Sequence, residues 1–306
     1  MTASTAGRLA VTVCVTGLVA PTVVGRAQTS AVKPIVLDVT VTDKASHYVT
    51  DLTATDFVVL DENVPQNLTS VARSTETPAA IALLLDSSAS TESTQQTVKE
   101  SAIRLVRKLK VGDVAEIVDF DSRVAVTQAF TDDATKLVGA IRKTSAGGSS
   151  SLFNAVYIAL RDFKRAATAP AGERQRRVVV LISDGEDTSS LLKFEEVLNL
   201  ARQSDAIIYT IRVPSTGPGL SPRRDNGIVM ELFAKETGGK AFVARGGSDA
   251  AKVADEISDE LANQYRLTFT PQQTTAKRPL HRVLVRVSRP DLKVRTRPGY
   301  LSPASP

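Results

Sequence analysis

Two hydrophobic patterns divide this chain. Over residues 77–263, continuous apolar runs alternate with segments in which apolar residues recur every three or four positions. A continuous apolar run is typical of a strand buried on both faces, and the wider spacing is typical of an amphipathic helix. This alternation predicts an α/β fold: a doubly wound, mostly parallel sheet flanked by helices.

Both ends of the chain carry short segments in which apolar and polar residues alternate, separated by turn residues. Such segments predict short strands. We expect the two ends to pack together as a small β-sandwich-like module, with the α/β domain inserted between them. The expected divisions are a signal peptide at residues 1–27, the N-terminal β module at 28–76, the α/β domain at 77–263 and the C-terminal strands at 264–306.

The last predicted hairpin carries a row of basic side chains. Val283, Val285 and Val287 are expected to point inward, so the intervening positions point outward. The expected outward set is Arg282, Arg286, Lys293, Arg295 and Arg297. A solvated face is the simpler interpretation of this row, and an anionic envelope surface is a partner that it would suit.

The first residues are typical of an export signal. An uncharged stretch at residues 9–24 follows Arg8, and Gly25 and Ala27 offer small side chains at the two positions that a signal peptidase reads. We expect cleavage after Ala27, with an uncleaved N-terminal anchor as the alternative, and a location in the periplasm, outside the cell or on its surface. No membrane span is expected after cleavage. Cleavage also removes Cys14, the only cysteine, which excludes a disulfide or a cysteine zinc site in the mature chain.

Composition argues against recognition of nucleic acids by stacking. Aromatic residues make up 5% of the chain and tryptophan is absent. A base-stacking platform is therefore not predicted. The formal charge of +5 falls to +3 when Arg8 and Arg26 leave with the signal peptide. The mature chain is mildly basic, and we expect no nucleic-acid partner.

Oxygen-bearing side chains follow two of the buried-strand patterns. Asp86, Ser88 and Ser90 come directly after the apolar run at residues 81–85, and Asp184 follows the run at residues 178–182. Between them, residues 147–151 form a turn rich in glycine and serine. Ligands of doubly wound sheets bind beyond the carboxyl ends of the strands. Carboxylate and hydroxyl oxygens without thiol or imidazole suit a hard divalent cation such as Mg²⁺ or Mn²⁺.

The order of these three loops resembles the von Willebrand factor type A domain and its metal-ion-dependent adhesion site. The resemblance implies that one cation is held, directly or through water, by Asp86, Ser88, Ser90, Ser150 and Asp184. The family has a threonine where Ser150 stands, and Ser149 is the alternative position. Serine keeps the hydroxyl but lacks the methyl group that restricts its rotamer. Residues 52–63 and 297–300 also resemble exported bacterial proteins of the acidobacterial type that carry such a domain.

The resemblance implies a protein-binding function of the adhesion type. The cation would leave one position open for an Asp or Glu carboxylate of a partner protein, and the chain would bind without acting as an enzyme. The loop at residues 214–225 follows a predicted strand and is expected on the same rim. It is either a tolerated insertion or a specificity loop in which Arg223 and Arg224 contact an acidic partner.

Other interpretations of the same residues stay open. Ser88 and Ser90 could simply cap the following helix, and Asp184 could belong to a turn. Asp121 and Asp187 are expected near the same edge without a direct role. A metal-assisted hydrolase would need a base, yet His47 and His281 fall in predicted strands of the β module. A structural envelope protein that binds through its β module is the second alternative.

Overall fold

The computed structural model describes residue 1 and residues 34–163, 165–166, 175–214, 226–271 and 279–301. The chain divides into two compact units, residues 1–32 and 33–306, and every helix and strand given below belongs to the second. The predicted signal peptide at residues 1–27 lies outside the described residues, apart from residue 1. Arg223 and Arg224 also lie outside them.

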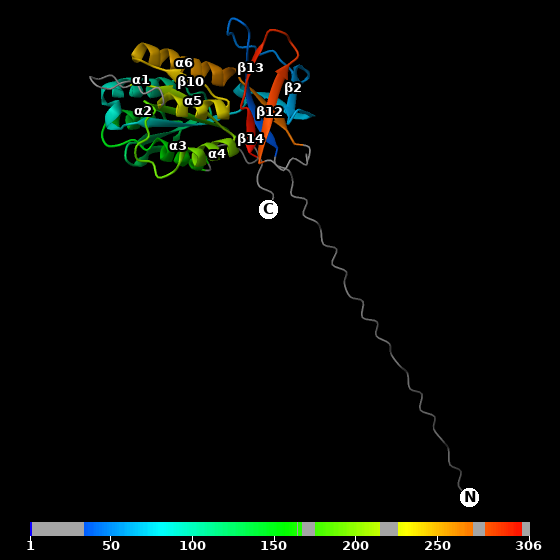
Figure 1. Ribbon diagram of the computed structural model, residues 1–306, viewed down its shortest axis with the longest axis horizontal. Coiled ribbons are helices and arrows are strands. Elements are labelled where there is room, and N and C mark those ends of the chain that lie inside the picture. The colour runs from blue at the N-terminus through cyan, green and yellow to red at the C-terminus, as the bar shows by residue number, and fades with distance from the viewer. Residues whose placement is uncertain (2–33, 164, 167–174, 215–225, 272–278, 302–306) are drawn as a thin grey trace. The chain divides into compact units, whose positions relative to one another are not determined.

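A sheet of mostly parallel strands forms the centre of the larger unit (Figure 1). Its order is β10 (Ala241–Val243), β9 (Ala206–Arg212), β8 (Arg176–Ser183), β5 (Ala79–Asp86), β6 (Val114–Phe120) and β7 (Val124–Thr131). Only the β6–β7 pair is antiparallel within this sheet. Strands β5 and β8 lie next to each other, although about ninety residues separate them in the chain. The chain therefore leaves β5 toward β6 on one side and later returns to β8 on the other.

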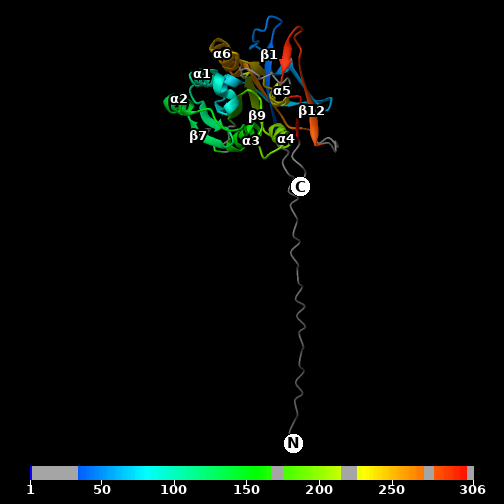
Figure 2. The same ribbon diagram turned by 60° about the vertical axis from the view of Figure 1, so that its left-hand side comes forward.

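Helices cover both faces of this sheet (Figure 2). One face packs against α1 (Gln95–Val106), α2 (Ala134–Lys143) and α6 (Gly247–Asn263). The other packs against α3 (Leu152–Asp162), α4 (Phe194–Gln203) and α5 (Asn226–Thr237). Leu83 and Leu84 are both buried but belong to opposite faces, as expected for a strand covered on both sides. The predicted doubly wound α/β class is confirmed.

Strands from both ends of the chain form two further sheets. One has the order β13 (Lys293–Arg295), β1 (Ile35–Thr42), β11 (Tyr265–Phe269) and β4 (Leu68–Arg73). The other has the order β14 (Gly299–Leu301), β12 (Leu280–Val287), β2 (Phe57–Asp61) and β3 (Val64–Gln66). Short 3-10 turns, η1 (Ala54–Asp56) and η2 (Ser74–Glu76), complete this region. The two sheets share one apolar core that includes Leu37, Val59, Leu267 and Val285. The β-sandwich-like part of the predicted fold class is confirmed.

The expectation of an outward basic row is wrong for Arg295 and Arg297. Arg295 forms an ion pair with Glu260 of α6 and donates to the Gly238 carbonyl at 2.6 Å. Arg297 is buried and donates to the Ser204 carbonyl at 2.9 Å. Alternation along a strand identifies its two faces but does not say whether the outer one meets water or another layer. Here it meets the helices and loops of the α/β domain, whereas Arg282, Arg286 and Lys293 are exposed.

Glu116 is an acidic side chain inside the α/β domain. It lies on β6, 1% exposed, and among the described residues its Oε1 has no hydrogen-bond partner. The pKa of Glu116 is raised from 4.5 to about 8, mainly by burial and also by the charge of Asp162 on α3, while the charge of Arg165 lowers it. The folded state therefore holds this proton at a pH where the unfolded chain has lost it.

We expect the free energy of unfolding to fall as pH rises from about 5 to 8. In this range the unfolded chain releases the Glu116 proton freely, whereas the folded chain must either keep the proton or carry a buried charge. The Glu116→Gln variant has no carboxyl proton to hold at this position. The difference in free energy of unfolding between the variant and wild type should therefore be more favourable to the variant at pH 8 than at pH 5.5, by at least about 1 kcal/mol. Urea unfolding at both pH values measures the difference. The exposed Glu195→Gln variant is the control. An equal pH response in Glu116→Gln and wild type would contradict this account.

Candidate functional site

The candidate site lies where the carboxyl ends of β5 and β8 meet. Asp86 is the last residue of β5, and Ser183 is the last residue of β8, directly before Asp184. Because the chain leaves these neighbouring strands in opposite directions, their following loops open a crevice rather than covering each other. The topology thus brings the sequence-predicted residues Asp86 and Asp184 to one edge of the sheet.

The carboxylate of Asp86 is fully buried and is surrounded by hydroxyl groups. Its Oδ1 accepts hydrogen bonds from the Ser88 amide at 2.9 Å and the Ser88 hydroxyl at 2.5 Å. Its Oδ2 accepts one from the Ser183 hydroxyl at 2.5 Å. The pKa of Asp86 is raised to about 6, because burial, with the charge of Asp184, outweighs the hydrogen bonds from Ser183 and Ser88 that lower it. Among the described residues no salt bridge neutralises this carboxylate, so the site favours a cation.

The first loop turns its serine side chains back toward Asp86. Ser88 stands before the 3-10 turn η3 (Ala89–Thr94), but its side chain makes no capping hydrogen bond. Instead its Oγ lies 2.5 Å from Asp86 Oδ1 and 3.1 Å from the Oγ of Ser90. The Thr91 hydroxyl holds the turn by donating to the Ser88 carbonyl at 2.8 Å. The helix-cap interpretation of Ser88 is therefore wrong.

Backbone hydrogen bonds attach the second loop to the first. The Gly147 amide donates to the Ser87 carbonyl at 2.8 Å, and the Ala89 amide donates to the Gly148 carbonyl at 3.0 Å. Gly148 has a φ of +70°, and a Cβ there would lie 3.0 Å from the Ser122 hydroxyl. Glycine is therefore needed at this position, both for its backbone conformation and for the close approach.

Ser150 presents a buried hydroxyl that lacks a partner. Its amide donates to the Thr188 hydroxyl at 3.0 Å, and its carbonyl accepts from the Thr188 amide at 2.8 Å. Its own Oγ is buried and has no hydrogen-bond partner within the described part of the chain. Ser149, the alternative position, is exposed. A buried hydroxyl without a partner is costly, so Ser150 is the better placed of the two to bind a ligand.

The third loop follows β8 and is held against the start of α3. Asp184 is 5% exposed, and its Oδ1 accepts from the Glu186 amide at 3.0 Å. Further along, Asp187 Oδ1 accepts from the Phe153 amide at 3.1 Å and from the Ser190 hydroxyl at 2.5 Å. Asp187 therefore orders this loop. Asp121 has a similar part in the neighbouring turn, because its carbonyl accepts from the Ser151 hydroxyl at 2.6 Å.

The donor set fits a hard divalent cation. Asp86 and Asp184 supply carboxylates, and Ser88, Ser90 and Ser150 supply hydroxyls from three loops that are hydrogen-bonded to one another. Within the described ranges, no group of three or more His, Cys, Asp or Glu side chains could hold a metal ion. The site differs from such groups because three of its five side chains are serines, which contribute hydroxyls. This composition suits Mg²⁺ or Mn²⁺ rather than a softer metal.

Two residues of the site were not singled out by the sequence analysis. Ser183 donates to Asp86, and Thr188 accepts from the Ser150 amide. The sequence pattern could have pointed to Ser183, because it is a polar residue at the end of an apolar run. No local pattern points to Thr188, since its role depends on a contact with a residue 38 positions away.

Both histidines lie in the β module. His281 is buried on β12, stacked on Tyr300, with its Nδ1 3.1 Å from Asp61 Oδ1. His47 was expected in a strand but lies in the turn after β1, beside Asp43. Neither residue belongs to the loops that surround Asp86.

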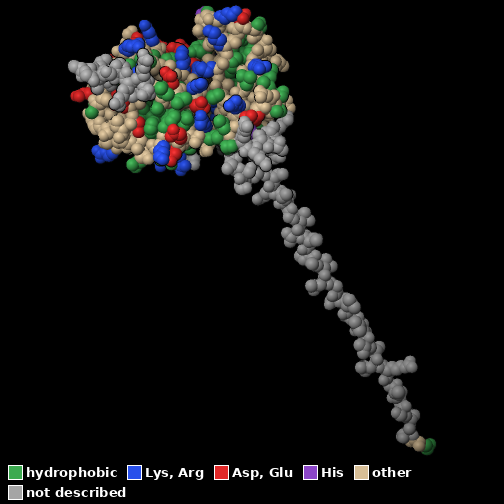
Figure 3. All heavy atoms as spheres, in the orientation of Figure 1, with side chains coloured by type: hydrophobic (Ala, Val, Ile, Leu, Met, Phe, Trp, Pro, Cys, Tyr) green, Lys and Arg blue, Asp and Glu red, His purple; other side chains and the backbone are tan. Residues whose placement is uncertain are grey.

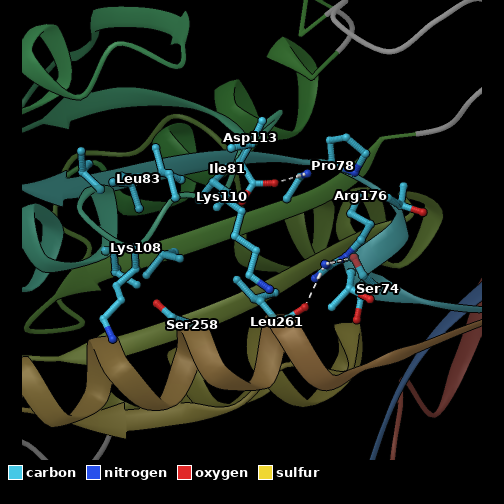
Figure 4. A pocket seen from close by; sticks show the side chains of 18 residues that line it. Ser74, Pro78, Ile81, Leu83, Lys108, Lys110, Asp113, Arg176, Ser258 and Leu261 are labelled. Carbon is cyan, nitrogen blue, oxygen red and sulfur yellow. Dashed lines mark hydrogen bonds between the residues drawn. The ribbon is translucent and has the colours of Figure 1, made fainter. Parts of the chain in front are cut away.

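A cavity of about 260 Å³ opens at the other edge of the parallel sheet (Figure 4). It is lined by Ala79 and Ile81 from the start of β5, by Leu105 of α1 and by Leu261 of α6. Arg176 at one end donates to the Ser74 carbonyl at 3.1 Å and to the Leu261 carbonyl at 2.9 Å, as Figure 4 shows. Ala79 begins β5 and Arg176 begins β8, whereas Asp86 and Asp184 lie at the other ends of these two strands, so the cavity is separate from the candidate site.

Comparison with known proteins identifies the domain. The family model of the von Willebrand factor type A domain matches residues 80–255. No curated protein matches the chain. Among solved structures, a von Willebrand factor type A protein from Catenulispora acidiphila is similar, with a TM-score of 0.50 and 10% identity, covering 90% of this chain and 75% of that one.

Two further structures are similar over a smaller share of this chain. BatB, a conserved hypothetical protein from Bacteroides thetaiotaomicron, has a TM-score of 0.47 and 18% identity, with 60% of this chain and 98% of that one covered. The von Willebrand domain of the type V pili tip protein Mfa5 from Porphyromonas gingivalis has a TM-score of 0.46 and 15% identity, with 60% and 94% covered. The match to residues 80–255 spans more than half of the sequence, and the chain therefore belongs to the von Willebrand factor type A domain family.

Proposed function

We propose that this protein binds a partner protein through a divalent cation held at the carboxyl ends of β5 and β8. One observation carries the proposal. The buried hydroxyl of Ser150 has no partner among the described residues, and its loop is hydrogen-bonded to the loop of the buried carboxylate of Asp86. Burying the polar groups of these three loops is unfavourable, and a bound cation would offset that free-energy cost.

The residues of the site would divide the work of holding the cation. Asp86 and Asp184 supply the negative charge, while Ser88, Ser90 and Ser150 supply neutral oxygens. With two carboxylates among its ligands, a bound Mg²⁺ or Mn²⁺ has its charge balanced and still attracts one more anionic oxygen. The Asp or Glu side chain of a partner is the protein group that supplies such an oxygen.

The proposed activity is binding without turnover. A hydrolase would need a general base within reach of the reacting atoms. Both histidines of the chain lie in the β module, and Asp86 is engaged by the hydroxyls of Ser88 and Ser183. The acids of the site are thus occupied in ways that suit holding a cation rather than transferring a proton.

We also propose that the protein works outside the cytoplasm, in the periplasm or at the cell surface. The signal pattern of residues 1–27 supports this location. Among the described residues, none of the helices combines the length and the hydrophobicity that crossing a bilayer requires. Membership of the acidobacterial type of exported protein stays a prediction.

Thermal unfolding with Mg²⁺, Mn²⁺ or EDTA tests the cation site. At an ion concentration one hundred times the dissociation constant, binding should stabilise the fold by about 2.7 kcal/mol. For a chain of this size the midpoint should rise by about 5 °C or more. The rise should disappear in Asp86→Ala, which removes a carboxylate ligand. Equal responses to the ion in wild type and in Asp86→Ala would contradict the proposal.

Ser150→Ala separates metal binding from folding more sharply. Because the Ser150 hydroxyl is buried and makes no hydrogen bond within the described structure, its removal should not lower the midpoint in EDTA and should raise it slightly. The dissociation constant for Mn²⁺ should rise by about tenfold, equivalent to about 1.4 kcal/mol. Ser149→Ala, one residue away and exposed, is the matched control and should bind as wild type. A loss in Ser149→Ala with none in Ser150→Ala would reverse the assignment.

Capture of a carboxylate can be tested without knowing the partner. Mn²⁺ bound to the protein should broaden the NMR signals of N-acetyl-aspartate amide, because the metal is paramagnetic and the carboxylate approaches it. N-acetyl-asparagine amide is the neutral control and should be broadened far less. The Asp86→Ala variant with the same total Mn²⁺ corrects for free ion. Equal broadening of both compounds would argue against binding through a carboxylate.

A further inference from the structure

The β-sandwich exposes an unusual face on the sheet formed by β14, β12, β2 and β3. Residues that pair across neighbouring antiparallel strands share a face, and Leu60 pairs with Leu284 while Val58 pairs with Arg286. Their neighbours Val59 and Val285 point the other way, into the sandwich core. We call the outward set the outer sheet face; its main residues are Val58, Leu60, Leu280, Arg282, Leu284 and Arg286.

Several solvent-facing positions of the outer sheet face carry apolar side chains, whereas such positions are usually polar in a sheet with one solvated face. Val58 is 44% exposed, Leu284 44% and Leu280 38%, although each belongs to a strand with one buried face. The remaining positions that pair with this set are Pro65, Leu301 and the buried Gly299, none of them polar. Antiparallel sheets normally alternate apolar and polar residues when one face meets water. A contiguous apolar surface of this kind marks an interaction site.

The two charged side chains that the four strands place on this face are both basic. Arg282 and Arg286 are exposed, and neither has an ion-pair partner within the part of the chain that the structure describes. Glu62 at the β2–β3 turn contacts the backbone amide of Arg282, at 2.7 Å, rather than its guanidinium. Elsewhere in the same module, Arg289 pairs with Asp51 at 2.8 Å. Figure 3 shows hydrophobic and basic side chains, with a few acidic ones, interspersed over this part of the molecule.

We propose that the outer sheet face binds the surface of an anionic phospholipid bilayer. Two interactions favour binding to such a surface: apolar side chains are buried at the headgroup boundary, and arginines are attracted to the lipid phosphates. A second copy of the chain is disfavoured, because equivalent faces would bring Arg282 and Arg286 against the same arginines. Apart from the two guanidinium groups, the outward side chains described on these strands offer no hydrogen-bonding group for the polar contacts of a protein interface.

The chain outside the described structure is consistent with this occupant. Residues 9–24 are uncharged and apolar, and about ten residues separate them from the start of β1. Such a linker spans at most about 35 Å when extended. If the segment is kept as an anchor, it would tether the chain to a bilayer. This inference does not rest on the metal site.

The absence of tryptophan allows a local test in the full-length protein. Leu284→Trp places a single fluorophore on the outer sheet face, at an exposed position that tolerates the change. Leu191→Trp is the matched control, because Leu191 is 92% exposed on the loop before α4, in the α/β domain. Both variants are titrated, in EDTA and at low salt, with vesicles of phosphatidylcholine alone or mixed with phosphatidylglycerol.

The proposal predicts a blue shift of Leu284→Trp emission with phosphatidylglycerol vesicles only, and no shift of Leu191→Trp. Adding Arg282→Gln and Arg286→Gln to the Leu284→Trp background should weaken binding about tenfold or more, because each arginine near an anionic surface contributes about fivefold. Equal shifts with both kinds of vesicle, or unchanged affinity without the arginines, would overturn it. A shift that depends on protein concentration without vesicles would indicate a second copy instead. The use of EDTA keeps either result independent of the metal site.

Discussion

The burial of the Asp86 carboxylate governs the structure around it. A carboxylate taken out of water is costly unless hydrogen bonds or an opposite charge surround it. Here Ser88 and Ser183 supply the hydrogen bonds, and they come from the loop after β5 and the end of β8. Both strands must therefore lie in register side by side before this group can be satisfied. The doubly wound topology provides that neighbourhood, because the chain turns away from β5 and β8 in opposite directions.

The three loops keep their positions through contacts among themselves. Main-chain hydrogen bonds join Ser87 to Gly147, Ala89 to Gly148, and Ser150 to Thr188. These bonds fix the backbone, so the side-chain oxygens need little rearrangement to receive a ligand. Groups that are already in place lower the entropy cost of binding. The same order leaves Ser150 Oγ without a partner in the described structure, which makes it the most informative atom of the site.

Local sequence pattern predicted much of the fold and less of the site. Continuous apolar runs identified β5 and β8, because strands buried on both faces carry no polar side chains in their interior. The pattern also placed Asp86 and Asp184 at their ends. It could not assign Thr188, whose function arises from a contact with Ser150. It misplaced Arg295 and Arg297 for a related reason, since alternation does not record which layer covers the outer side of a strand.

The position of β1 between β11 and β13 has a mechanical consequence. The register pairs Ile35 with Phe269 at one end of the β1–β11 ladder and Val39 with Tyr265 at the other. A pull on the N-terminus enters β1 at Ile35, and a pull on the α/β domain enters β11 at Tyr265, directly after α6. The two forces act at opposite ends of an antiparallel pair and load it in shear. All hydrogen bonds of the ladder then resist together instead of breaking one after another, a geometry suited to a chain held at one end and pulled at the other.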